Sequence, residues 1–203
     1  MGKKIILVGG GGHCKVVIDT IKKSKKFTIY GIIDPNFRKV KYVSGVKVIG
    51  SDDLLKGLFK KGIRNAFISV ASIGNCNIRK KIYDNLRKNK FQLPVLVHPR
   101  AVVANGVMLG KGSFVAAGAV INPGVKIGEN AIINTSSSID HDCIIGNFVH
   151  IAPGATLCGK VIVGDETHIG VGANIIQNIK IGNKCMVRAG ATLIKNLEDS
   201  SKF

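Results

Sequence analysis

A six-residue period runs through the second half of the chain. From Val97 to Leu193 every sixth residue is aliphatic, over seventeen consecutive blocks without an insertion. The fifth position of each block is small or apolar, as at Ala101, Ser113 and Ala131. An α-helix has a period of about 3.6 residues and a strand a period of about two, so neither explains this pattern. The repeat predicts a left-handed parallel β-helix, in which three hexads with one short strand each form a triangular coil.

The first half of the chain has a different pattern, in which apolar runs alternate with helical periodicity. Strands are predicted over 3–8, 28–33 and 65–70, and helices over 13–23, 52–61 and 75–89. Such alternation favours a small parallel sheet covered by helices. The predicted fold is therefore a small α/β Rossmann-like unit over 1–94, followed by the left-handed β-helix over 95–203. The last residues, 196–203, are short and polar, and we expect them to be frayed.

The net charge of +18 is concentrated in the first half of the chain. Residues 1–96 contain 21 Lys and Arg against 5 Asp and Glu, which leaves an excess of +16. This excess can attract nucleic acid or a small anion, or it can be a solvated lysine-rich surface. The chain has no Trp and few other aromatic residues to stack on bases, so nucleic acid is not an expected partner.

The cysteines indicate a reducing environment. There are five of them, an odd number, and none forms a CxxC pair. We therefore expect free thiols, a cytoplasmic location and no metal site. No stretch approaches the roughly 18 consecutive apolar residues of a membrane helix, so no membrane span is expected.

Four consecutive glycines, Gly9 to Gly12, separate the first predicted strand from the first predicted helix. Such a loop brings backbone N–H groups close to a ligand, and the following helix dipole favours phosphate. A dinucleotide fingerprint that started at Gly9 would need glycine where Cys14 stands, so a hydride-transfer enzyme is not expected.

A nucleotide diphosphate is the more plausible ligand of this loop. Gly11, Gly12 and His13 are the candidate phosphate contacts, and Asp34, after the second predicted strand, is placed to contact a ribose or a base. The alternative reading is that the loop needs glycine only for its backbone torsions.

Three histidines lie inside the repeat region. His150 and His168 are 18 residues apart, so they should be neighbours in successive coils. His141 lies between Asp140 and Asp142. Flanking carboxylates can orient an imidazole and strengthen it as a general base, although a surface histidine between acids can also serve only to balance charge.

Four stretches resemble one family of enzymes. They are GGGGH over 9–13, SIGNCNIRKKIY over 72–83, NTSSSIDHDC over 134–143 and IGNFVH over 145–150. The chain resembles the bacterial sugar O- and N-acetyltransferases of the PglD and NeuD type, most closely the UDP-4-amino-sugar N-acetyltransferases of the bacillosamine pathway. The resemblance covers essentially the whole chain.

This resemblance implies a homotrimer that uses acetyl-CoA as co-substrate and acetylates a nucleotide-linked 4-amino-4,6-dideoxy sugar. His141 matches the general base, Asp142 its acidic neighbour and Asn134 a polar residue near the reacting centre. The nucleotide-sugar contacts implied are Gly11, Gly12, His13, Asp34 and Gly74. The acetyl-CoA contacts implied are His150, Val171 and Ala189.

Three positions depart from the family pattern: the bacillosamine-pathway members have glutamate where Asp142 stands, and glycine is usual where Ala189 and Cys14 stand. Two alternative functions are considered. One is O-acetylation of sialic acid, for which the same base would serve. The other is a catalytically silent β-helix that acts as a binding module.

Overall fold

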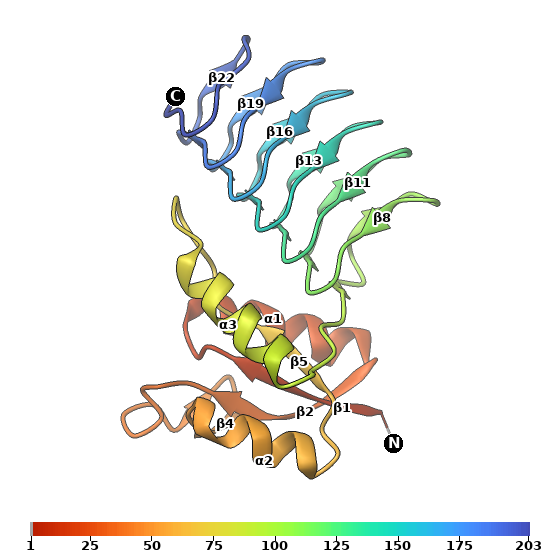
Figure 1. Cartoon of the computed structure of the whole chain (residues 1–203). Helices are drawn as coiled ribbons and strands as arrows, with labels where there is room; N and C mark the ends of the chain where they lie inside the picture. The colour runs from red at the N-terminus through yellow and green to blue at the C-terminus, as the bar shows by residue number, and fades with distance from the viewer. Residues whose placement is uncertain (1) are drawn as a thin grey trace. The chain divides into compact units, whose positions relative to one another are not determined.

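The computed structural model describes residues 2–203 and contains two units (Figure 1). The first unit consists of the chain up to Ala71 together with Asn77–Leu96. The second consists of Ser72–Cys76 and Val97–Phe203. The short segment Ser72–Cys76 thus belongs with the repeat region, although it lies within the N-terminal half of the sequence.

The first unit is built on a five-stranded sheet in the order β3-β4-β2-β1-β5. Its strands are β1 (Lys3–Val8), β2 (Phe27–Ile33), β3 (Tyr42–Val43), β4 (Val46–Gly50) and β5 (Asn65–Ile68). β1 pairs in parallel with both β2 and β5, and its last four residues are buried. A central strand buried on both faces must be apolar throughout, which explains the run Ile5 to Val8.

Three helices and a 3-10 turn complete this unit. They are α1 (Gly12–Ser24), the turn η1 (Asp52–Leu54), α2 (Leu55–Lys60) and α3 (Asn77–Lys88). The predicted strands and helices are all present with small shifts at their ends, so the α/β prediction is confirmed. The hairpin of β3 and β4 was not predicted. Its turn, Ser44-Gly45, has positive φ at both residues, as a two-residue hairpin requires.

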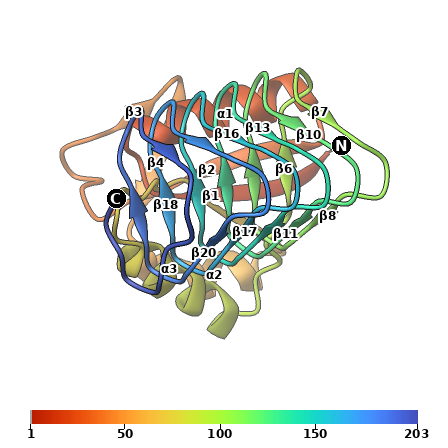
Figure 2. The ribbon, with the colours of Figure 1, turned by 90° about the horizontal axis from the view of Figure 1, so that it is seen from above.

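The second unit is a parallel β-helix whose seventeen two-residue strands form three faces (Figure 2). Each face is named after its first strand. The β6 face contains β6 (Leu96–Val97), β9 (Phe114–Val115), β12 (Ile132–Ile133), β15 (His150–Ile151), β18 (His168–Ile169) and β21 (Met186–Val187). The β7 face contains β7 (Val102–Val103), β10 (Val120–Ile121), β13 (Ser138–Ile139), β16 (Thr156–Leu157), β19 (Asn174–Ile175) and β22 (Thr192–Leu193). The β8 face contains β8 (Met108–Leu109), β11 (Lys126–Ile127), β14 (Ile144–Ile145), β17 (Ile162–Val163) and β20 (Lys180–Ile181).

The register of these strands follows the sequence period. Each strand pairs with the strand 18 residues later, as Ile133 does with Ile151 and Ile139 with Leu157. The aliphatic residue of each hexad points inward, and the small fifth residue joins it in the core, where Ala119, Ala131 and Ala155 are fully buried. The predicted β-helix is therefore confirmed, with one aliphatic residue per strand filling its interior.

The C-terminal segment differs from its prediction. We expected 196–203 to be frayed, but it continues the coil. The amide of Phe203 donates to the Met186 carbonyl at 2.9 Å, and the amide of Arg188 donates to the Phe203 carbonyl at 2.7 Å. Leu197 and Phe203 also pack against the β-helix core. The prediction was wrong because it rested on the polar residues of this segment and did not consider that Leu197 and Phe203 could pack against the core.

Candidate functional site

The glycine loop leaves bare backbone at the start of α1. Gly11 is the N-cap residue, no side chain caps the helix, and the first turn has no acidic residue. A Cβ atom at Gly11 or Gly12 would meet nothing within 4 Å, and neither residue has a positive φ. The fold therefore requires neither glycine, in contrast to Gly9, whose φ is +106° and whose Cβ would lie 2.2 Å from Val70. His13 follows in the first helical turn and is half-buried.

Asp34 fastens this loop to the end of β2. One carboxylate oxygen accepts from the amide of Gly10 at 2.6 Å, and the other accepts from the amide of Asn36 at 2.7 Å. Charge-assisted hydrogen bonds of this kind are stronger than neutral ones, and they fix the loop beside the carboxyl ends of β1 and β2. Each oxygen retains a lone pair that a ligand hydroxyl or N–H group can use.

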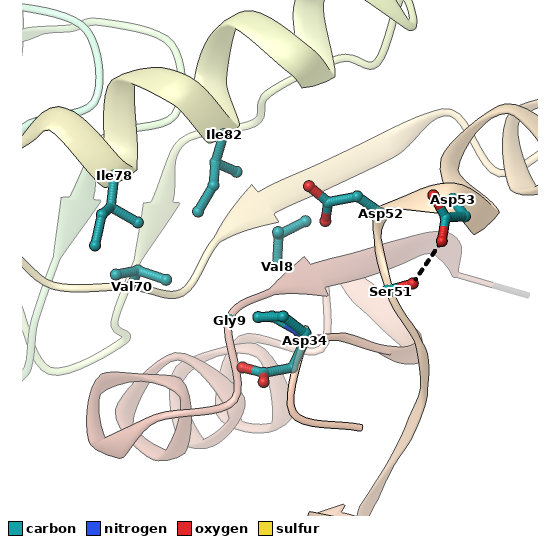
Figure 3. Close-up of a pocket in the computed structure, with 10 residues that line it drawn as sticks. Val8, Gly9, Asp34, Ser51, Asp52, Asp53, Val70, Ile78 and Ile82 are labelled. Carbon is teal, nitrogen blue, oxygen red and sulfur yellow. Dashed lines mark hydrogen bonds between the residues drawn. The ribbon is translucent and has the colours of Figure 1, made fainter. Parts of the chain in front are cut away.

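A cavity of about 380 Å³ lies beside Asp34 (Figure 3). Its lining residues are Val8, Gly9, Asp34, Pro35, Ser51, Asp52, Asp53, Val70, Ile78 and Ile82. Figure 3 shows Ile78 and Ile82 reaching from α3 toward Val70 and Val8. Asp34, Asp52 and Asp53 are three of the five acidic residues in the first 96 positions, so negative charge is concentrated here within a basic unit. Such a lining repels phosphate and suits an apolar ring that carries hydrogen-bond donors.

His141 and Asp142 form an exposed pair at the corner between the β7 and β8 faces. Nδ1 of His141 lies 2.9 Å from Oδ2 of Asp142, and about half of each side chain is exposed. A carboxylate can only accept, so Nδ1 carries a proton, and in the neutral ring Nε2 is the nitrogen that has the lone pair. Asp142 has a φ of +61°, a left-handed conformation that aspartate tolerates better than most residues.

Asp140 holds the backbone of the same corner. Its Oδ1 accepts from the Asn122 side chain and from the His141 amide, both at 2.8 Å. The Asn122 hydrogen bond, together with the His141 amide, holds the pKa of Asp140 below its usual range. Asp140 therefore remains a carboxylate and fixes the backbone from which the imidazole projects.

A second polar group lies at the corner between the β6 and β7 faces, where His150 links Asn134 to the segment Ser72–Cys76. Nδ1 of His150 is 2.7 Å from the Ser72 carbonyl oxygen, and Nε2 is 3.1 Å from the Asn134 side-chain nitrogen. Because the carbonyl must accept, His150 is protonated at Nδ1 and accepts from Asn134 at Nε2. With both nitrogens occupied and only 5% of its surface exposed, His150 holds these two groups together.

His168 lies directly beside His150, edge to face, as neighbours in successive coils that their spacing in the sequence predicted. The two residues are paired in adjacent strands, and their ring centroids are 4.9 Å apart. Burial lowers the pKa of His168, so it remains neutral beside His150.

Gly74 lies in the Ser72–Cys76 segment. Its φ is +67°, and a Cβ there would lie 3.3 Å from the sulfur of Met186. Val171 and Ala189 are both exposed and stack 18 residues apart at the corner between the β6 and β7 faces. The structure thus groups Asn134, Val171 and Ala189 along one edge of the β-helix and places His141 along another.

Cys143, beside the His141 pair, points into the core. It is fully buried, and burial raises the pKa of its thiol to about 11. A nucleophilic cysteine must be a thiolate and accessible, so Cys143 does not serve as an acyl carrier.

Two residues of the His141 corner, Asn122 and Gly159, were not assigned from the sequence. Asn122 and Asp140 are 18 residues apart, and Gly159 follows His141 by the same interval. The coil period that predicted the fold also brings these residues into contact, so the 18-residue spacing was the available signal.

Among residues 2–203, no group of three or more His, Cys, Asp and Glu side chains is arranged to hold a metal ion. In the same described part of the chain, none of the helices is both long and apolar enough to cross a membrane.

Comparisons with known proteins agree with this architecture. The model of the PglD N-terminal domain matches residues 4–86, and the model of the bacterial transferase hexapeptide, six repeats, matches residues 124–159. A UDP-N-acetylbacillosamine N-acetyltransferase of Bacillus subtilis is 32% identical over 120 residues, which are 57% of this chain. The match spans 52%, about half, of that relative's length.

Solved structures match over nearly the whole chain. Perosamine N-acetyltransferase from Caulobacter crescentus, in complex with CoA and GDP-perosamine and with a histidine replaced by asparagine, is 37% identical. The match has a TM-score of 0.92 and covers 98% of this chain and 92% of that one. The acetyltransferase domain of PglB from Neisseria gonorrhoeae, in complex with acetyl coenzyme A, is 35% identical. That match has a TM-score of 0.90 and covers 100% of this chain and 96% of the other.

The α/β unit, the uninterrupted hexads and the exposed histidine–carboxylate pair therefore occur together in a chain that matches these enzymes from end to end. This chain belongs to the family of bacterial hexapeptide-repeat sugar acetyltransferases that carry a PglD-type N-terminal domain.

Proposed function

We propose that this protein transfers the acetyl group of acetyl-CoA to the amino group of a nucleotide-linked 4-amino-4,6-dideoxy sugar. The observation that carries the proposal is the His141–Asp142 pair, in which Nδ1 faces a carboxylate and the imidazole lies on an exposed corner. Relatives in complex with CoA and GDP-perosamine, or with acetyl coenzyme A, support the same chemistry.

The reaction is a direct transfer between two bound substrates. The sugar nitrogen attacks the thioester carbonyl, a C–N bond forms, and the C–S bond breaks to release CoA. Nε2 of His141 takes the proton that the nitrogen loses, and this proton finally goes to the CoA sulfur. Asp142 keeps the proton of the ring at Nδ1 and offsets the positive charge that develops on the imidazole. No covalent acyl-enzyme is required.

The N-terminal unit binds the nucleotide in this proposal. The start of α1, where Gly11 is the N-cap without a side-chain cap and Gly12 and His13 follow in the first turn, suits the diphosphate, because a helix N-terminus favours negative charge. The acid-lined cavity beside Asp34 suits the ribose and the base, whose hydroxyl and N–H groups can donate to its carboxylates. One relative is named for a UDP-linked sugar, and another was solved with a GDP-linked sugar. The nucleobase of the substrate is therefore identified by measuring which nucleotide binds.

A homotrimer completes the proposal. The edge that carries Val171 and Ala189, the acetyl-CoA contacts implied by the resemblance, differs from the edge that carries His141. Packing of neighbouring copies would bring one edge of each kind together and would cover the exposed apolar residues Ile144 and Ile162 of the β8 face. Five free cysteines and the use of acetyl-CoA support a cytoplasmic location.

One assay separates this function from its alternatives. CoA release is measured with UDP-, dTDP- and GDP-linked 4-amino sugars and with free sialic acid, each with acetyl-CoA. The proposal predicts turnover of at least one nucleotide-linked amino sugar and loss of that turnover in the His141→Ala variant. Turnover of sialic acid alone would establish the O-acetyltransferase instead. Binding of a nucleotide without release of CoA from any acceptor would favour the silent binding module.

A further inference from the structure

The imidazole of His141 lies against the backbone of the next coil. A Cβ atom built on Gly159 would be 2.6 Å from Nε2 of His141 and 2.7 Å from Cε1. Real Cβ contacts are essentially never shorter than 3.0 Å. The ring therefore occupies the space that any side chain at Gly159 would need.

The fold gives no other reason for glycine at this position. Gly159 does not have the left-handed φ that favours glycine. Gly159 is the third residue of its hexad, counted from Val97. In all the other hexads the third residue has a side chain, as at Ala117, Gln177 and Ala189. Gly159 is the only glycine at this position of the hexad between Val97 and Leu193, and it lies one coil after the histidine.

The carboxylate of the pair is held in a similar way on the preceding coil. A Cβ atom at Gly124 would lie 2.4 Å from Oδ1 of Asp142. Gly124 has a positive φ, but so do Lys160 and Asn178 at the equivalent position, so this corner also accepts side chains. The two partners thus lie against two bare α-carbons, one on either side of their own coil.

We propose that Gly159 is a positioning residue for the base: its bare α-carbon is the surface on which the His141 imidazole rests with Nε2 directed to the acceptor. The catalytic consequence rests on the proposed function, whereas the contact itself does not. A methyl group at residue 159 displaces the ring while leaving the coil backbone unchanged. Displacing a reacting group by about 1 Å can cost roughly 10²-fold in rate.

The test is a double-mutant cycle of Gly159→Ala and His141→Ala, with Gln177→Ala as the control. The control places alanine at the same corner position one coil further from the imidazole. Thermal unfolding and steady-state kinetics are measured for all four proteins and the control. We expect Gly159→Ala to lower kcat by roughly 10- to 100-fold with little change in KM. In the His141→Ala background the same change should cost nothing further, and Gln177→Ala should behave like the wild type.

Thermal unfolding distinguishes a clash with the His141 imidazole from any other effect of the Gly159→Ala substitution. If Gly159→Ala folds poorly only when His141 is present, the clash with the imidazole is demonstrated directly. If it is equally damaging after His141 has been removed, in stability or in residual rate, Gly159 acts for another reason and the inference is overturned. Wild-type kcat in Gly159→Ala also overturns it. Failure of the proposed function is a separate result, namely His141→Ala at wild-type rate, and the stability coupling would still report on the contact.

Discussion

Nδ1 of His150 donates to the carbonyl oxygen of Ser72 across 2.7 Å, and this bond ties the segment Ser72–Cys76 to the β6 face. A further contact on the same segment joins the Cys76 thiol to the Glu166 carboxylate at 3.3 Å. The resemblance implied an acetyl-CoA contact for His150. The geometry adds a second role, because the segment that it holds contains Gly74, a proposed nucleotide-sugar contact.

The first prediction concerns this tether. His150→Ala should release the segment, so its amides should exchange with solvent at least several-fold faster in hydrogen-exchange mass spectrometry. His98→Ala is the matched control, because His98 is also a buried histidine of the β-helix unit and accepts instead from the Arg100 amide. Equal acceleration of exchange over 72–76 in both variants would show that the tether is not specific.

The second prediction concerns acid stability. Hydrogen bonds from the Asn183 amide and side chain hold the pKa of Asp199 below its usual range. A depressed pKa in the folded state stabilises the protein above the unfolded pKa of about 3.9, and this contribution is lost as the pH falls through the folded value. Asp199→Asn should therefore reduce the loss of melting temperature below about pH 4. Glu198→Gln, which removes the neighbouring charge, should not; a similar reduction there would indicate a general charge effect.

The β-helix could be predicted from the sequence because its period repeats in every block. The aliphatic residues of the hexads must all point into the coil. The six-residue period therefore predicts the strands, their register and the core residues together. The hairpin of β3 and β4 has no such repetition. Its signal was limited to Ser44 and Gly45 between two very short apolar runs. Apolar anchors in a polar segment, such as Phe203, are likewise recognisable only once the preceding coil is in place.

The candidate site was predicted in part. The chemistry of His141 and Asp142 follows from their adjacency in the sequence, and their hydrogen bond is a local one. The roles of Asn122 and Gly159 depend on contacts between coils, which only an 18-residue comparison would reveal. For Gly11 and Gly12, the sequence left open whether torsion or ligand access requires glycine. Their ordinary φ values and empty surroundings favour ligand access.

The third prediction tests the trimer. Ile144 and Ile162 are paired neighbours on the β8 face, and both are exposed in the single chain. Ile144→Lys places a charge where a neighbouring copy would pack, and burying an unpaired charge is strongly unfavourable. Light scattering should show roughly 65 kDa for the wild type, three times 21.6 kDa, and a smaller mass for the variant. Tyr42→Lys, on an exposed residue of the other unit, should leave the mass unchanged. A wild-type monomer at micromolar concentration would refute the trimer.

The fourth prediction concerns the nucleotide. Gly12→Val should block the approach of a phosphate to the start of α1, because the space beside Gly12 is empty only while no side chain fills it. KM for the nucleotide-linked sugar should rise and KM for acetyl-CoA should stay near the wild-type value. Gly57→Val is the control, since Gly57 also has free space and lies in α2. Calorimetry with UDP, dTDP and GDP should detect binding of at least one to the wild type, and weaker binding to Gly12→Val.

The fifth prediction separates the roles of the two histidines. His141→Ala removes the proposed general base, so kcat should fall by roughly 10²- to 10⁴-fold with little change in KM. Asp142→Asn keeps an oxygen that can accept from Nδ1 but removes the charge that offsets the developing imidazolium, so its loss in kcat should be smaller than that of His141→Ala. His150→Ala should act mainly on substrate affinity, through KM, because both nitrogens of His150 are occupied by Asn134 and Ser72 and neither is available to take a proton. If His141→Ala and His150→Ala show the same kinetic defect, His141 is not the base and the assignment of roles is wrong.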